Sequence, residues 1–299
     1  MTDTTAVQQT GQPVGKMTLK TALSSESVKR KFEEMLGRKA PGFITSIMNV
    51  VSNNALLQKA DNNSIILAAA TAAALDLPIN PNLGYAALIP YQDKKAGTCS
   101  CQMQVMRNGW VELAQRSGQV IKITNEIVYE GELAKFNRFK DEYEFDETQR
   151  KSDKIIGYMA YVKLANGFEK TVFCTIEKCK EHGLRYSQTF KKGYGNWKDD
   201  FNGMALKTVL KHLIVKYVPK SLEMQMAIER DQAALTGDID NPQPVYVDNR
   251  GEMSDTGAPA EDFQEAEVVE QEFHKTPASD STSAQGQFQF NPQANQVES

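Results

Sequence analysis

The segment IIGYMAYVKLANGFEKTVFC, residues 155–174, contains two β-rich runs on either side of Asn166-Gly167. An Asn-Gly pair between such runs is typical of a tight β-hairpin, because both residues tolerate the positive φ angles that the turn requires. The segment therefore predicts two antiparallel strands, residues 155–164 and 168–174, and places a sheet at the centre of the fold.

Other strands and helices are predicted on both sides of this hairpin. Alternating or β-rich runs predict strands over residues 85–91, 98–105, 120–129 and 142–145. Helical spacing and capping residues predict helices over residues 25–36, 41–51, 63–75, 106–117, 175–182, 197–217 and 221–235. This order predicts an α+β fold with a helical N-terminal block, a central small antiparallel or mixed sheet with an intervening helix, and a long C-terminal helix.

The composition divides the chain into three parts. Residues 1–23 are rich in Thr, Gln and Gly without hydrophobic periodicity, and we expect them to be a disordered arm. Residues 24–236 contain the predicted helices and strands and form the folded body. Residues 237–299 are acidic and poor in large apolar side chains, and we expect them to be a disordered tail.

Charge is distributed unevenly along the chain, whose total formal charge is −4. Residues 231–299 contain 14 Asp and Glu against 2 Lys and Arg, which leaves 32 Lys and Arg and 24 Asp and Glu in residues 1–230. The first 230 residues therefore carry a net charge of +8, and the remainder carries −12. A basic body of this kind indicates a polyanionic partner.

Several classes of protein are disfavoured. No apolar run is long enough to span a membrane, and Met1–Gly15 lacks the basic and apolar regions of a secretory signal, so we expect a cytoplasmic protein without a membrane partner. The four cysteines are too few for a disulfide framework, and Cys174 and Cys179 are not spaced as zinc ligands. Gly-x-Ser-x-Gly and His-Glu-x-x-His motifs are absent, and we expect neither catalytic residues nor a metal site.

Residues 185–220 are the strongest candidate for a binding site, because eight Lys and Arg side chains occur there with only two carboxylates. Aromatic residues are interleaved with the first of them, namely Tyr186, Phe190, Tyr194 and Trp197. Basic groups neutralise phosphates and exposed aromatic rings stack on bases, which is how single-stranded nucleic acid is bound. Lys207 and Lys211 fall beside the apolar stripe of the predicted helix. A solvated face of an ordinary amphipathic helix explains the same spacing, but the basic body favours nucleic acid.

A second basic group and two carboxylate clusters leave further possibilities open. The predicted strands 85–91 and 98–105 form a hairpin whose turn contains Lys94 and Lys95. Arg107 and Arg116 begin and end the helix that follows this basic hairpin tip, and the N-terminus of the helix can accept a phosphate. A metal-dependent nuclease would use paired carboxylates, for which Asp199-Asp200 and Asp141–Asp146 are the candidates. Asp199 and Asp200 also open a helix, where acidic residues favour the helix dipole, and this second explanation is the stronger one.

Three segments in the folded body share the order and spacing of one known family. They are LDLPINPNLGYAALIPY (residues 75–91), QMQVMRNGWVELAQRSGQ (residues 102–119), and the helix after Trp197 that contains MALKTVLK (residues 204–211). Together they resemble the RecT family of phage-type single-strand annealing proteins. The resemblance extends over about Ser25–Glu229.

This resemblance implies an ATP-independent recombinase that coats single-stranded DNA, anneals complementary strands and promotes strand invasion, with the α+β fold of single-strand annealing proteins. Residues 24–236 would bind DNA and oligomerise into rings or a helical filament. The implied partners are a 5′→3′ exonuclease and the host single-strand binding protein, in the cytoplasm of a bacterium, with the gene carried by a phage or prophage. No cofactor is required, and Mg²⁺ is a modulator of annealing. A passive coating protein that blocks annealing is the remaining alternative.

The basic pattern and the resemblance together define a set of candidate DNA-binding residues. Those on the first hairpin and the helix after it are Lys94, Lys95, Arg107 and Arg116. Those in the second half of the body are Arg185, Lys191, Lys192, Trp197, Lys198, Lys207, Thr208 and Lys211.

Overall fold

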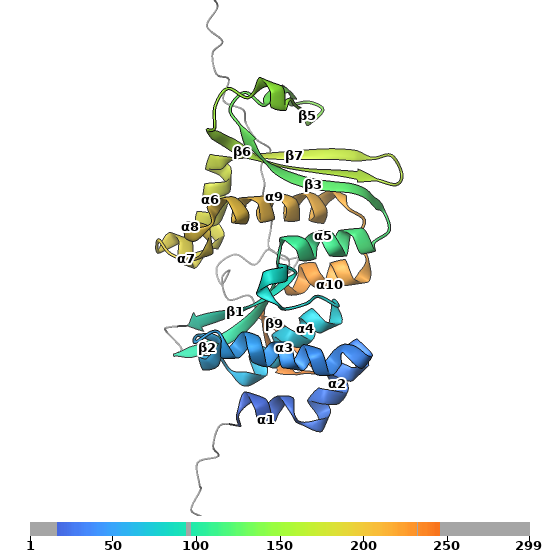
Figure 1. The fold of residues 1–299 in the computed structure, drawn as a ribbon, viewed down its shortest axis with the longest axis vertical. Helices are drawn as coiled ribbons and strands as arrows, with labels where there is room; N and C mark the ends of the chain where they lie inside the picture. Colours follow the sequence, from blue (N-terminus) through green and yellow to red (C-terminus); the bar gives the residue numbers. More distant parts are fainter. Residues whose placement is uncertain (1–16, 94–96, 232, 246–299) are drawn as a thin grey trace, which may run out of the picture. The chain divides into compact units, whose positions relative to one another are not determined.

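The computed structural model describes residues 17–93, 97–231 and 233–245, and the fold is given for these residues (Figure 1). Its first part is helical: α1 (Leu19–Leu23), α2 (Glu26–Leu36), α3 (Ala40–Ser52) and α4 (Asn62–Ala74). Asp61 caps α4, because its Oδ2 accepts a hydrogen bond from the Ser64 N–H at 2.9 Å. Apolar residues surround the axis of α4 on nearly all sides, and this helix is consequently buried in the core.

One antiparallel sheet packs against α4. It contains β1 (Ala86–Asp93), β2 (Thr98–Val105), β8 (Ala234–Asp238) and β9 (Asn241–Val245), in the order β1-β2-β8-β9. The β1–β2 hairpin is in continuous register from Ala86 opposite Val105 to Asp93 opposite Thr98. Leu235 of β8 packs against Leu67 of α4 and so joins the end of the described chain to the N-terminal helices.

A second antiparallel sheet supports the longest helix. Its strands are β3 (Val120–Tyr129), β6 (Ile155–Leu164) and β7 (Glu169–Thr175), in the order β3-β6-β7. Helix α9 (Phe201–Tyr217) lies across one face of this sheet (Figure 1). Alternate residues of β6, including Tyr158 and Val162, are buried on that face. The Tyr158 hydroxyl donates to Asn202 Oδ1 at 2.6 Å, and this bond ties the sheet to the first turn of α9.

A small hairpin, β4 (Leu133–Asn137) and β5 (Glu142–Phe145), completes the strands. The Phe136 and Tyr143 rings stack with centroids 4.6 Å apart, and Phe145 packs 5.9 Å from Phe173 of β7. This aromatic row joins the hairpin to β7.

The remaining α-helices lie along the chain between the strands of the two larger sheets or lead into α9. Helix α5 (Arg107–Arg116) follows β2 and packs against α9, while α10 (Leu222–Arg230) packs against α5. Helices α6 (Ile176–Tyr186), α7 (Gln188–Lys191) and α8 (Asn196–Asp199) run from β7 to the start of α9. Among the helices described, none is long and apolar enough to cross a membrane.

The α+β class and most predicted elements are confirmed. The Asn166-Gly167 hairpin is observed, with Gly167 at a φ of 87°. The predicted single central sheet is wrong, because the β1–β2 hairpin belongs to one sheet and β3, β6 and β7 to another. Strand β4 was not predicted. The predicted helix over 197–217 is two helices separated at Asp200, and the stretch after Gly183 contains α7.

Both predicted boundaries of the folded body need correction. The arm over 1–23 was expected to be disordered, but Leu19–Leu23 is a helix, with Thr18 as its N-cap and Leu23 buried. The tail over 237–299 was expected to be disordered, but residues 237–245 belong to the β8–β9 hairpin. The predicted helix over 221–235 ends at Arg230, because the chain then enters this hairpin and pairs with β2. Residues 1–16 and 246–299 lie outside the described part of the chain.

Candidate nucleic-acid interface

The basic stretch predicted as a binding site folds into consecutive helices, α6 to α9. Asp200 caps α9 through its Oδ1, which accepts the Gly203 N–H at 3.0 Å. The close packing of α6 depends on Gly183, since a Cβ at this position would lie 2.9 Å from a ring carbon of Trp197. Asp200 thus opens α9, as predicted for the paired aspartates, whereas Asp199 is the last residue of α8.

The aromatic residues of this stretch are mostly internal. Trp197 is buried, with its ring centroid 5.8 Å from Phe190 and 5.5 Å from Phe201. A buried ring cannot stack on a base without rearrangement, so the structure gives Trp197 a packing role instead of the predicted DNA contact. Tyr194 is half exposed, at 52% of its surface, whereas Tyr186 and Phe190 are partly buried.

Lys207 is buried in the core of this region, with 5% of its surface exposed. Its Nζ lies 3.6 Å from Met106 Sδ, at the start of α5. Burial lowers the pKa of Lys207, the nearby Lys211 lowers it further, and the Asp231 carboxylate raises it. The sequence placed Lys207 beside the apolar stripe on an accessible face, and this is wrong because α5 covers α9 there.

Lys211, one turn further along α9, is linked to a buried carboxylate. Its Nζ lies 3.3 Å from Asp231 Oδ2, and the exposed fractions of the two side chains are 18% and 0%. The same ammonium group lies 5.6 Å from the centroid of the Trp110 ring, a cation–π geometry. Lys211 is thus held in place by α5 and by the residue that follows α10, and part of its side chain remains accessible.

Helix α6 contributes further positive charge next to Lys211. The pKa of His182 is lowered to about 4, first by burial and then by Lys211, His212 and Arg185. The Arg185 guanidinium lies 5.4 Å from the centroid of the Tyr186 ring. His182 is therefore neutral near pH 7, and after burial, which is the largest cause, Arg185 of α6 and Lys211 of α9 both lower its pKa. We call Lys207, Lys211 and Arg185 the α6–α9 basic cluster.

Other predicted residues lie outside this cluster. Lys191, Lys192 and Lys198 are exposed on α7, the residue after it, and α8, and Arg107 is exposed at the start of α5. The Thr208 hydroxyl donates to the Met204 carbonyl at 2.8 Å within α9. Lys94 and Lys95 lie outside the described residues.

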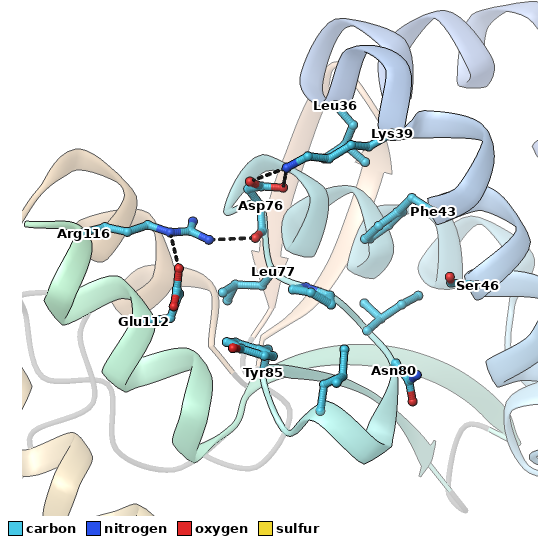
Figure 2. A pocket seen from close by; sticks show the side chains of 13 residues that line it. Leu36, Lys39, Phe43, Ser46, Asp76, Leu77, Asn80, Tyr85, Glu112 and Arg116 are labelled. Carbon is cyan, nitrogen blue, oxygen red and sulfur yellow. Dashed lines mark hydrogen bonds and ion pairs between the residues drawn. The ribbon is translucent and has the colours of Figure 1, made fainter. Parts of the chain in front are cut away.

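Arg116 is engaged with the protein rather than with the basic cluster (Figure 2). Its guanidinium donates to the Leu75 and Asp76 carbonyls at 2.8 and 3.0 Å and to Glu112 Oε1 at 3.0 Å. Lys39 forms an ion pair with the Asp76 carboxylate at 3.0 Å. These contacts lie at the edge of a cavity of about 630 Å³ and join α5 to the end of α4. Arg116 was predicted to contact DNA, whereas its described contacts are structural.

The carboxylates considered for a nuclease have local partners. Asp146 accepts hydrogen bonds from Thr148 and Gln149, and Asp141 forms an ion pair with Lys170. Within the described ranges, no group of three or more His, Cys, Asp or Glu residues is arranged to hold a metal ion. Asp231 is the important side chain that the sequence did not indicate, because its partner Lys211 is distant in sequence and the α10–β8 turn was predicted as helix.

Comparisons with known proteins agree with this organisation. A family model described as the RecT family matches residues 41–247. The uncharacterized protein YqaK of Bacillus subtilis (strain 168) is 44% identical over 236 residues, which cover 79% of this chain and 78% of that protein. Protein RecT of Escherichia coli (strain K12) is 29% identical over 179 residues, which cover 59% of this chain and 65% of that protein.

Proposed function

The chain belongs to the RecT family, and from this premise we propose that it binds single-stranded DNA and anneals complementary strands without ATP. The observation that carries the proposal is the α6–α9 basic cluster. Lys207 and Lys211 of α9 and Arg185 of α6 belong to it, and Lys211 and Arg185 are among the charges that lower the pKa of His182 after burial, which is the largest cause. Such a concentration of positive charge suits the phosphates of a nucleic-acid backbone.

Contacts to phosphate are well suited to annealing. They hold a strand in register along the protein but carry no base information, so the base edges stay free to test a complementary strand. Annealing makes and breaks no covalent bond, and an energy source is not needed for the favourable pairing of two strands. We expect binding to depend little on base sequence, because the cluster contains no Asn or Gln set against a groove edge.

Assembly and partners follow from the same proposal. One cluster of a few cations binds weakly, and several copies on one strand multiply the contacts, so we propose a homo-oligomer on DNA, as a ring or helical filament. We propose strand invasion as a second activity, a 5′→3′ exonuclease and the host single-strand binding protein as partners, and Mg²⁺ as a modulator of annealing. The setting would be the cytoplasm of a bacterium that carries the gene on a phage or prophage.

The proposal is tested by mixing the full chain with two complementary oligonucleotides, one fluorescent and one quenching, without nucleotide and with either EDTA or Mg²⁺. We expect faster duplex formation than without protein, and intact strands on a denaturing gel. Slower duplex formation would show a passive coating protein. Shortened strands that appear only with Mg²⁺ would show a nuclease, and either result contradicts annealing as the function.

A further inference from the structure

The lysines of the basic cluster have a carboxylate neighbour inside the protein, and its position suggests a role in DNA binding. Resting on the proposed function, we propose that Asp231 is an internal counter-ion that competes with a DNA phosphate for Lys211, and that DNA binding draws this lysine away from it. Asp231 would then set how tightly the cluster holds a strand.

The geometry of Asp231 joins three elements. Asp231 follows the last residue of α10, and its own N–H donates to the Ala227 carbonyl at 2.9 Å. One carboxylate oxygen, Oδ1, accepts the Val105 N–H of β2 at 2.8 Å. The other, Oδ2, lies 3.3 Å from the Lys211 Nζ of α9. The two oxygens thus have separate tasks, one holding the backbone and the other holding the lysine.

The charges explain why a carboxylate is present at all. Two lysines, one with 5% of its residue surface exposed and one with 18% of its side chain exposed, lie close enough for Lys211 to lower the pKa of Lys207. Uncompensated buried cations are costly, and Asp231 opposes this cost because it raises the pKa of Lys207. A phosphate on the accessible side of Lys211 would supply negative charge to the same lysine.

The exposed fractions of Asp231 and Lys211 decide which of the two side chains a phosphate can reach. The Asp231 side chain is completely buried, whereas part of the Lys211 side chain is accessible. A phosphate can therefore approach Lys211 from its accessible side, while Asp231 keeps its bond to the Val105 N–H. The group that stabilises the free protein is then a competitor of DNA, and by linkage its removal strengthens DNA binding.

The substitution Asp231→Asn separates the two tasks. The amide oxygen can still accept the Val105 N–H, whereas the negative charge toward Lys211 is lost. Asp240→Asn is the matched control, because Asp240 pairs with Lys31 at 2.9 Å on the exposed β8–β9 turn, where 70% of the aspartate side chain is accessible.

We would measure binding of a fluorescent single-stranded oligonucleotide and thermal unfolding with and without DNA, for wild type, D231N and D240N as full chains. We expect D231N to melt at a lower temperature than wild type without DNA, to gain more from added DNA, and to bind about 5-fold tighter at low salt. We expect D240N to resemble wild type. Should D231N be unfolded alone, near-UV circular dichroism would follow its refolding, which the proposal expects single-stranded DNA to restore.

Equal or weaker DNA binding by D231N, equal or smaller stabilisation by DNA, or failure of DNA to refold an unfolded D231N would overturn the counter-ion role. These results leave the proposed function intact as long as wild type binds and anneals DNA. Absence of DNA binding by wild type is a different result, and it would overturn the proposed function together with this inference.

Discussion

Two segments that resemble the RecT family contain basic residues with different surroundings: Arg116 on α5, and Lys207 and Lys211 on α9. Arg116 donates to two carbonyls and a carboxylate of the protein, and these bonds fasten α5 to the end of α4. Lys207 has a thioether as its described contact, and Lys211 shares one buried carboxylate with it. The comparison teaches that the number of basic residues in a segment does not tell which of them hold the fold together, as Arg116 does.

The largest effect on the free energy of unfolding is expected at Arg116. Arg116→Met removes three charge-assisted hydrogen bonds and should lower the free energy of unfolding by about 3 kcal/mol. Affinity for single-stranded DNA should stay within about 2-fold of wild type, since Arg116 lies outside the α6–α9 basic cluster. Urea unfolding and oligonucleotide binding measure the two quantities. A stable R116M that loses DNA binding would reverse the roles assigned to the two regions.

The second prediction is the pH dependence of stability that His182 contributes. Its pKa in the folded chain is about 4, below the ordinary 6.5, so the unfolded chain binds more protons between these values. Its contribution to stability is therefore fully present above pH 6.5 and is lost as the pH falls toward 4, by about 2 to 3 kcal/mol.

Unfolding by urea at several pH values, for wild type and His182→Gln, isolates this contribution. The difference in free energy of unfolding between the two proteins should shrink as the pH falls from 6.5 to 4. A constant difference over this range would mean that burial and the neighbouring positive charges do not lower the pKa of His182.

A smaller change in the free energy of unfolding, of opposite sign to that of R116M, is expected at Lys207. Lys207→Met keeps the apolar stem and removes a buried cation, and it should raise the free energy of unfolding by about 1 kcal/mol. DNA affinity should nevertheless fall, because the lysine supplies charge to the bound strand. Higher stability with weaker binding distinguishes a binding residue from a structural one, and the same thermal and binding assays measure both. A less stable K207M with wild-type affinity would assign Lys207 to the core alone.

Most elements of the fold could be predicted from patterns within single segments of the sequence. The Asn166-Gly167 hairpin and the helix between β2 and β3 were predicted because turn residues and helical spacing are signals within one segment. The separation into two sheets was not predicted, because pairing between β2 and β8 joins residues more than a hundred positions apart. The short α1 helix was missed because its stability comes from burying Leu23 against later elements.

The candidate site was only partly predictable for a related reason. The sequence shows how many basic residues a segment contains, and residues 185–220 were predicted as a binding site on that ground. It does not show which basic residues are bound by internal partners, as Arg116 is, or which aromatic ring is buried in the core, as Trp197 is. Asp231 carried no signal at all, since a single acidic residue beyond a helix is common.

The central claim is that Lys211 of α9 contacts DNA phosphates, and the salt dependence of binding tests it most directly. We would measure the dissociation constant for single-stranded DNA over a range of salt for wild type, Lys211→Met and the control Lys39→Met, whose ion pair with Asp76 is exposed. The account predicts that K211M binds about 10-fold more weakly at low salt, with a slope of log affinity against log salt smaller by about 0.7, and that K39M matches wild type. A folded K211M with the affinity and the slope of wild type would contradict it.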